Sequence, residues 1–202
     1  MTETAGGEKV PFIPYVEELP HFLEPIVGPY KERMGFLPNA LKFYMHRPEI
    51  AETLFTLNNT VMRDPSSTLD QNLKRRLATV ASKLNGCTYC TSHHCNILLS
   101  PEGGGAEGWG MTETEVQDML TGELAPQNDF ERVCFDFVKA ASQDPANVPD
   151  EVRQALTEHL TPAQIVELAA VVGFWKLYNT IHDALDIPIE AHLHQYMGFV
   201  DL

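Results

Sequence analysis

The sequence predicts an all-α protein, and three observations support this expectation. Apolar residues recur at helical spacing along much of the chain, helix-capping signatures stand ahead of several of these segments, and no convincing pair of alternating strands is joined by a hairpin turn. The chain has 202 residues, of which 44% are hydrophobic and 21% are charged. This composition is typical of a globular protein that buries one sizeable core, or two small ones, without disulfides.

The first 38 residues are expected to form an extended N-terminal arm. Six prolines fall within residues 11–38, and each proline fixes its own backbone angle and lacks the N–H that a helix needs. We therefore expect at most short helices in this arm, which would wrap the body or a neighbouring subunit. Residues 39–202 are expected to form a single all-helical domain.

Helical patterning begins at Asn39. Pro48 suits the first turn of a helix that the break at 64–67 ends. Apolar residues at intervals of three or four then form one stripe over 69–84, and Asn85–Gly86 is expected to terminate that helix. A further helix is expected to begin at the cysteines that follow.

Downstream of the cysteines, a glycine-rich loop at 103–110 precedes three more helical segments. Residues 112–115 have the form of a capping box, and residues 130–141 have a strong amphipathic pattern. Thr161-Pro162-Ala163-Gln164 combines an N-cap, a proline at the first helical position and a box-closing glutamine. The helix that it opens is expected to end before Pro188.

Two related helical modules are suggested by an internal similarity. The stretch 160–185 resembles 68–93 in plan, but Asn179 and His182 stand where cysteines would be. Only the first module therefore carries the thiols. The expected modules are a thiol module at about 66–100 and a degenerate second module at about 129–188.

The charge balance excludes several classes of function. With 14 Lys and Arg against 28 Asp and Glu, the formal net charge is −14, which repels phosphate backbones and anionic lipids. We expect no nucleic-acid partner and no membrane partner. The chain shows neither a membrane-spanning apolar run nor a signal-peptide pattern, so a cytoplasmic location is expected.

The strongest chemical signal lies in residues 85–95, which contain three of the four cysteines. If a helix begins at Cys87, then Cys87, Cys90 and His94 share one narrow face at about 100° per residue. His93 points elsewhere on the same helix and is a weaker candidate.

These residue types in this pattern favour dithiol redox chemistry. A thiol in the first turn of a helix meets unpaired backbone N–H groups and the positive end of the helix dipole, which stabilise its thiolate. A second thiol three residues on can convert a sulfenic acid into a disulfide. His94, one turn beyond Cys90, can take or relay the proton.

Two other interpretations compete with the dithiol. A Cys-x-x-Cys pair near a histidine could hold zinc, but a structural zinc site usually needs four ligands, and no second paired motif follows. His192 and His194 lack a third ligand as well, so we predict no metal and no cofactor. Buried unreactive cysteines would explain two small core residues, but not their position at a helix start beside a histidine.

The stretch from Leu77 to His94 resembles the core of the alkylhydroperoxidase D-like, carboxymuconolactone decarboxylase superfamily, and within it the peroxidase-related branch. The likeness rests mainly on the Cys-x-x-Cys-x-x-x-His pattern after Asn85–Gly86. It implies an all-helical fold, assembly as trimers or hexamers, and reduction of a small hydroperoxide with electrons from an external dithiol donor.

The resemblance also implies a role for each residue of the motif. Cys90 would be attacked by the peroxide, Cys87 would resolve the product into a disulfide, and His94 would join a proton relay with a glutamate. The position at the helix start alone favours Cys87 as the better thiolate, so the order of the two thiols stays open at this point.

The sequence departs from the family pattern at the glutamate. Arg75 occupies that position, and a guanidinium stays protonated in proteins and cannot act as a base. Arg75 could instead steady a thiolate, while Glu167 or Asp183 of the second module could supply the carboxylate. Tyr89 replaces the histidine that the family places between the cysteines.

The sequence thus predicts a thiol-dependent peroxidase, an oxidoreductase, with two alternatives. The superfamily also contains lactone decarboxylases, but these lack the cysteine pair. The other alternative is a non-catalytic or metal-binding helical protein whose site has decayed, and the arginine at position 75 is the reason to consider it.

Overall fold

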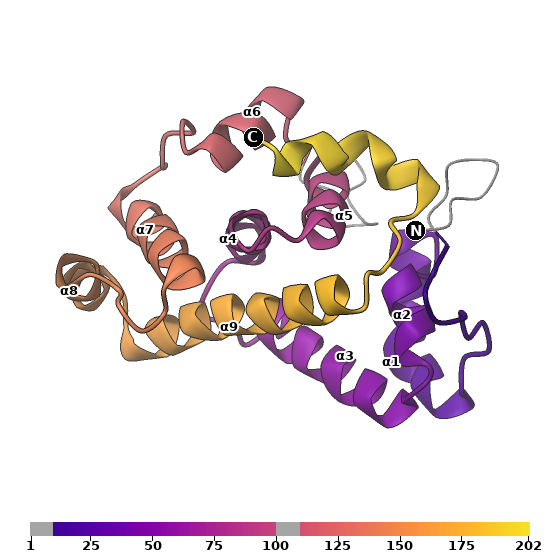
Figure 1. Cartoon of the computed structure of the whole chain (residues 1–202). Coiled ribbons are helices and arrows are strands. Elements are labelled where there is room, and N and C mark those ends of the chain that lie inside the picture. Colours follow the sequence, from indigo (N-terminus) through magenta and orange to yellow (C-terminus); the bar gives the residue numbers. More distant parts are fainter. Residues whose placement is uncertain (1–9, 100–109) are drawn as a thin grey trace.

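A computed structural model of the chain describes residues 10–99 and 110–202, and every regular element within these two ranges is a helix, as predicted (Figure 1). The glycine-rich loop expected at 103–110 lies, except for its last residue, outside the described residues. None of the helices in the described ranges is long and apolar enough to cross a bilayer. The elements are η1 (His21–Leu23), α1 (Glu24–Met34), α2 (Asn39–Tyr44), α3 (Pro48–Arg63), α4 (Gln71–Leu84), α5 (Thr88–Leu99), α6 (Glu113–Thr121), α7 (Asp129–Gln143), α8 (Asp150–His159), α9 (Pro162–Ala184) and η2 (Ala191–Val200), where η denotes a 3₁₀ helix.

The N-terminal segment contains more helix than its prolines predict, because α1 is 11 residues long. Pro25 lies in the first turn, where its missing N–H costs nothing, but Pro29 lies inside the helix. Packing against α3 offsets this defect: Val27 is buried, and the Tyr30 ring meets the Phe55 ring edge-on at 5.4 Å between centroids. Tertiary contacts therefore override local propensity here.

Helix α4 lies at the centre of the molecule, with α5, α7 and α9 around it (Figure 1). Its predicted apolar stripe is buried, with Leu73, Leu77 and Ala81 at most 5% exposed. Asp70 caps its first turn by accepting from the Leu73 N–H. Gly86 then adopts φ 77°, a left-handed conformation that glycine reaches without strain, and turns the chain from α4 into α5.

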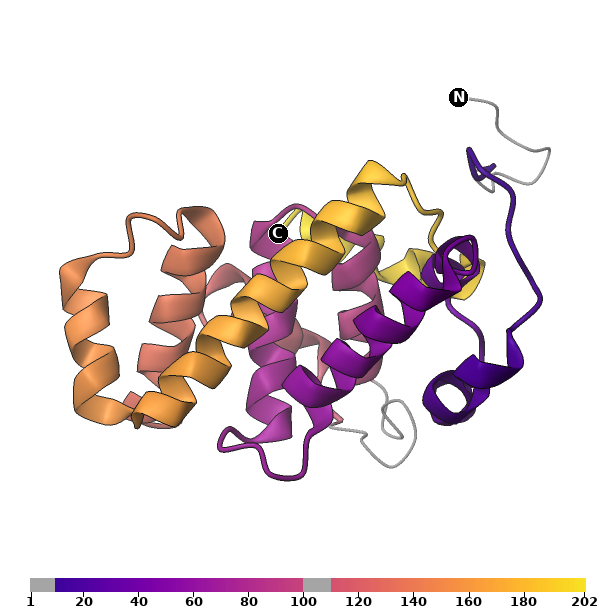
Figure 2. The same ribbon diagram turned by 90° about the horizontal axis from the view of Figure 1, so that it is seen from below.

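Helix α9 connects the two ends of the molecule. It begins with the predicted capping box, in which Thr161 and Gln164 bond to each other's backbone N–H groups, and it runs along one side of the fold from α8 toward α2 (Figures 1 and 2). Its buried face packs against α3, α4, α5 and α7. Its last turn brings His182 to the start of α5, while η2 covers the outer side of α5. The division into an arm and two related modules stays a prediction.

Candidate active site

The Cys-x-x-Cys pair lies at the start of α5. Cys87 is the residue that precedes the helix, and its carbonyl oxygen accepts from the Thr91 N–H. The Cys90 N–H points at the Cys87 Sγ, at 3.5 Å. Cys87 and Cys90 are 0% and 2% exposed, and both are free thiols. The first turn of α5 thus holds two buried thiols side by side.

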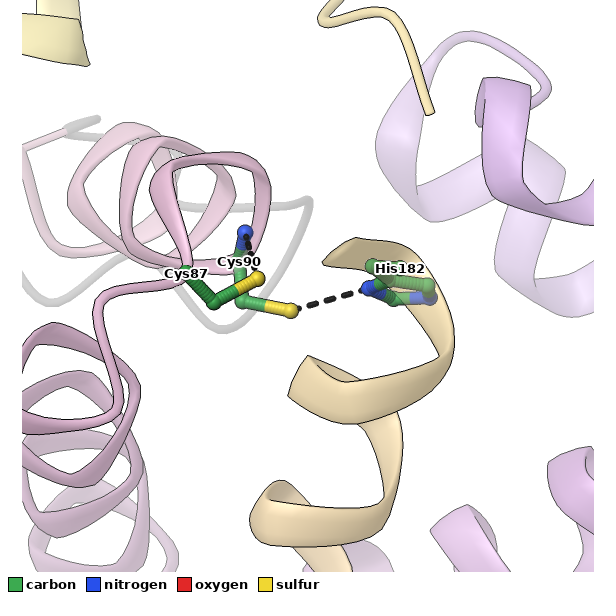
Figure 3. A group of neighbouring side chains, drawn as sticks. All are labelled: Cys87, Cys90 and His182. Carbon is green, nitrogen blue, oxygen red and sulfur yellow. Dashed lines mark hydrogen bonds between the residues drawn. The ribbon is translucent and has the colours of Figure 1, made fainter. Parts of the chain in front are cut away.

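The imidazole that contacts this pair belongs to His182 of α9 (Figure 3). Its Nδ1 lies 2.9 Å from the Cys90 Sγ, and its Nε2 lies 2.6 Å from the Tyr44 Oη. The two sulfurs and a ring nitrogen of His182 all lie within 4.8 Å of one another. The His182 side chain is 5% exposed. The available signal was the internal similarity, which aligned His182 with a cysteine position.

Both partners of the Cys90–His182 hydrogen bond are uncharged at neutral pH. Burial raises the pKa of the Cys90 thiol well above its usual value, and Cys87 adds to this shift. Burial also lowers the pKa of His182 to about 3. A low-dielectric interior favours the neutral forms of both groups. With both groups neutral, the Cys90 S–H donates to the His182 Nδ1, and the His182 Nε2–H donates to the Tyr44 Oη.

His94 lies on the same cavity as Cys90 but is bonded to a different partner. Its Nδ1 lies 3.0 Å from a guanidinium nitrogen of Arg75, and its ring meets the Trp175 indole edge-on. Burial, and then the Arg75 charge, lower the pKa of His94 well below its usual value. Because a guanidinium only donates, the neutral ring carries its proton on Nε2, a buried atom with no hydrogen-bond partner among residues 10–99 and 110–202.

Arg75 therefore sits at the site in place of a base. It is 3% exposed on α4, and it lines the cavity that Cys90 and His94 also line. This cavity has a volume of about 60 Å³. Aromatic side chains form much of its wall: Tyr30, Tyr44, Phe55, Tyr89, Trp175 and Tyr178.

Tyr89 and His93 hold the C-terminal segment through Glu190. The Tyr89 hydroxyl donates to one Glu190 oxygen at 3.0 Å, and His93 Nε2 lies 2.8 Å from the other. The Asn39 N–H also donates to this carboxylate, at 2.5 Å. Burial opposes the charge of Glu190, but the hydrogen bond and charge of His93 outweigh it and lower the pKa to about 2. These residues form the wall of the site, and sequence reasoning did not single out Glu190.

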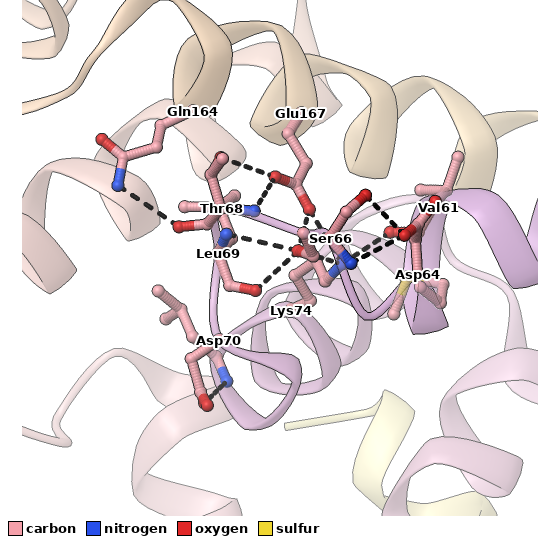
Figure 4. Close-up of polar contacts among 12 residues, drawn as sticks. Val61, Asp64, Ser66, Thr68, Leu69, Asp70, Lys74, Gln164 and Glu167 are labelled. Atoms are coloured by element: carbon pink, nitrogen blue, oxygen red, sulfur yellow. Dashed lines mark hydrogen bonds and ion pairs between the residues drawn. The ribbon is translucent and has the colours of Figure 1, made fainter.

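The structure does not bring Glu167 to the thiols. Glu167 and His182 lie 15 residues apart on α9, or about 22 Å along the helix axis. Glu167 instead accepts from Ser67 and Thr68 and pairs with the fully buried Lys74 at 2.9 Å (Figure 4). This candidate carboxylate has a structural role.

Asp183 is the speculative carboxylate that does reach a thiol. It follows His182, its side chain is largely exposed, and the Cys87 thiol lies close enough to affect its pKa. Partial burial raises the pKa of Asp183, and the Cys87 thiol opposes that rise. A second cavity of about 530 Å³, lined by Thr88, His182 and Asp183, opens on this side of the pair. Cys90 lines the smaller cavity, and its partner His182 lines both.

Fold and site together define a helical protein with a buried dithiol and an adjoining imidazole. Residues 48–128, which include the thiol pair, match the model of the carboxymuconolactone decarboxylase family. This match covers the thiol pair and the helices around it, and beyond it the likeness to known proteins is one of fold.

Individual relatives are distant or cover a small part of the chain. The uncharacterized protein YnjA of Escherichia coli (strain K12) is 33% identical over 64 residues, which span 32% of this chain and 35% of that protein. The chain therefore matches only about a third of the length of this curated relative.

Solved structures share the fold over nearly the whole chain. An uncharacterized peroxidase-related protein from Silicibacter sp. TM1040 superposes with a TM-score of 0.75 at 23% identity, covering 98% of this chain and 99% of that one. A peroxidase-related protein from Ralstonia eutropha JMP134 gives 0.72 at 20% identity, over 92% and 94%. The debrominase Bmp8 in complex with 2,3,4-tribromopyrrole gives 0.74 at 22% identity, over 95% and 100%.

Proposed function

We propose that this protein is a thiol-dependent peroxidase that reduces small hydroperoxides through Cys87 and Cys90. One observation carries the proposal: a buried thiol is hydrogen-bonded to a neutral imidazole at 2.9 Å, with a second thiol beside both. A nucleophile, its base and a resolving thiol are the groups that peroxide reduction by a dithiol needs.

In the first step, His182 accepts the Cys90 proton as the sulfur attacks the terminal peroxide oxygen. The O–O bond breaks, and the departing alkoxide takes up the proton that His182 received and leaves as an alcohol, while the terminal O–H stays on Cys90 as a sulfenic acid. His94 supports this step, because it lines the shared cavity and its Nε2–H has no partner among the described residues. Arg75 holds His94 in that tautomer.

In the second step, the Cys87 sulfur attacks the sulfenic acid and releases water, which leaves a Cys87–Cys90 disulfide. Asp183, whose pKa the neighbouring Cys87 thiol affects, is the carboxylate proposed to accept the thiol proton. An external dithiol then reduces the disulfide. Cys90 is the attacked thiol in this scheme because it alone of the pair is hydrogen-bonded to His182.

The proposal is tested by titrating free thiols before and after one equivalent of hydroperoxide. We expect the loss of two thiols per chain, and no loss in the Cys90→Ser variant. In Cys87→Ser, a sulfenic acid should persist on Cys90 and react with a dimedone probe. Cys134→Ala is the matched control, since Cys134 is a buried thiol of α7 outside the site. Unchanged thiols in the folded wild-type protein would overturn the proposal.

A second candidate activity uses the same dithiol, and the aromatic wall of the cavity beside Cys90 favours it. Two thiols can reduce a halogenated aromatic ring to the dehalogenated ring and a hydrogen halide, with formation of one disulfide. The fold shared with the debrominase Bmp8 supports testing this reaction. Bromide release from a bromopyrrole, without peroxide turnover, would favour this candidate over the peroxidase.

We also propose the setting in which the site works. The partners are a small hydroperoxide and a dithiol donor, and the location is the cytoplasm. Assembly into a homo-oligomer, a trimer or a hexamer, is supported by an exposed apolar stripe on α9, where Val166 and Leu177 are 70% and 42% exposed. Light scattering of the reduced protein measures the number of subunits.

A further inference from the structure

The thiol pair and His182 have the composition of a metal site as well as of a redox site. We propose that Cys87, Cys90 and His182 bind one Zn²⁺ ion when the dithiol is reduced. The set was hidden in the sequence, because the third ligand lies 92 positions beyond Cys90 and a metal site could not be argued from the Cys-x-x-Cys pair alone. This inference does not depend on the proposed peroxidase activity.

The ligand types select zinc. Two thiolates and one imidazole are the soft and borderline donors that zinc prefers, and three protein ligands with one open position are the pattern of catalytic zinc sites. Both thiols release their protons on binding, so two H⁺ leave for each Zn²⁺ that enters. Two thiolates cancel the charge of the dication, which gives a neutral complex suited to side chains that are at most 5% exposed.

The distances fit with small adjustments. Tetrahedral zinc with Zn–S of about 2.3 Å and Zn–N of about 2.0 Å places neighbouring ligand atoms about 3.5–3.8 Å apart. The three ligand atoms lie within 4.8 Å of one another, and Cys90 Sγ is 2.9 Å from His182 Nδ1. That pair must separate by less than 1 Å, which rotation about the Cys90 side-chain bond can supply, since the proton that joins them leaves.

The surroundings supply the second requirement of a metal site, an oriented imidazole. Tyr44 bonds to the His182 Nε2 at 2.6 Å and stays a neutral phenol, so the ring keeps Nδ1 directed at the sulfurs. Access comes from the larger cavity, which Asp183 and Asp186 line together with His182. These carboxylates attract a cation to the entrance.

Occupancy by zinc and oxidation exclude each other, because a disulfide has no free thiolate. Zinc would therefore protect the reduced pair from alkylation and from peroxide, and oxidation would release it. The state of the Cys87–Cys90 pair then depends on both the zinc supply and the oxidant concentration.

The test uses the full-length reduced protein and Co²⁺ as a spectroscopic probe. We expect one Co²⁺ per chain with a thiolate-to-cobalt charge-transfer band and the intense visible bands of tetrahedral cobalt, both abolished by one equivalent of Zn²⁺. Cys87→Ser, Cys90→Ser and the disulfide form should lack the charge-transfer band. Tyr44→Phe should bind Zn²⁺ about 10–100-fold more weakly.

Two controls keep the test decisive. Cys134→Ala and His159→Ala remove a buried thiol and an exposed imidazole outside the site and should bind Co²⁺ as the wild type does. His182→Gln, checked for folding by circular dichroism, should lose tetrahedral binding while retaining both thiols. The proposal is overturned if the reduced wild type gives no charge-transfer band, or if the band survives in Cys87→Ser or His182→Gln.

Discussion

The two buried histidines of the site differ in the residue that each contacts. His182 bonds to a thiol and to Tyr44, whereas His94 bonds to a guanidinium. Both rings are neutral because burial disfavours their charged forms. Of the two rings, His182 is the one hydrogen-bonded to Cys90, and for this reason the proposed mechanism makes His182 the base and His94 the donor to the substrate.

Replacing His182 separates these roles. In His182→Gln, we expect the rate of Cys90 oxidation by hydroperoxide to fall by about 10²–10⁴, the range that a general base contributes. Stopped-flow oxidation at several pH values measures the rate, and the remaining rate should rise with pH as hydroxide generates the thiolate. An unchanged rate, together with a large loss in His94→Gln, would assign the base to His94 instead.

Arg75 controls the protonation of its neighbour. Removing the charge in Arg75→Gln should raise the pKa of His94, because the guanidinium is the second cause, after burial, of its depression. The pKa should stay below the usual value since the ring remains buried. Titration of the ring protons by NMR measures it. No rise at His94 would contradict the assigned contact.

At the scale of the elements, α9 is fixed at both ends by polar groups. Near the N-terminus of α9, Glu167 pairs with Lys74 of α4 (Figure 4). It also accepts hydrogen bonds from Ser67 and Thr68 in the turn before α4. Near its C-terminus, Asn179 accepts from Asn85 at 2.8 Å. The position of His182 against Cys90 therefore depends on contacts along the whole length of the helix.

Breaking the Glu167–Lys74 ion pair near the N-terminus of α9 should lower the free energy of unfolding. In Glu167→Gln, the ammonium of Lys74 stays buried without its carboxylate, and we expect a loss of about 3 kcal/mol in the free energy of unfolding. Urea denaturation measures it. Glu49→Gln removes an exposed ion pair with Arg47 and should change stability by less than about 1 kcal/mol. Equal effects of the two substitutions would show that the buried pair contributes no more than the exposed one.

At the scale of the whole molecule, the C-terminal segment closes the fold over the site. Glu190 bonds to Asn39 at the start of α2 and to Tyr89 and His93 of α5. Three parts of the chain that are far apart in sequence thus meet at one buried carboxylate. At a net charge of −14, repulsion among the acidic groups of the surface destabilises the folded state. Attractive contacts such as those of Glu190 oppose this repulsion.

The Glu190 contacts predict how stability depends on pH. The pKa of Glu190 is about 2 in the folded protein against an ordinary value of 4.5. The unfolded chain therefore binds the extra proton first, so stability is full above about pH 4.5 and is lost as the pH falls toward 2. A shift of this size corresponds to about 3 kcal/mol.

Denaturation of wild type and Glu190→Gln across this pH window tests the prediction. The variant should be less stable at neutral pH and should lose less stability on acidification. Glu167 titrates in the same range, since its hydrogen bonds with Ser67 and Lys74 outweigh its partial burial and lower its pKa to about 2, so some pH dependence should remain. Parallel curves for the two proteins would contradict the assigned role of Glu190.

The sequence by itself determined the helical class, most helix boundaries and the Cys-x-x-Cys pair at a helix start. These features follow from local spacing, from caps such as Thr161, and from the left-handed turn at Gly86. The tertiary structure alone decided the partners of the thiols. His182 lies 92 positions beyond Cys90, and Glu190 lies 97 positions beyond His93. Helical periodicity places a residue on a face, but it does not say which distant helix packs against that face.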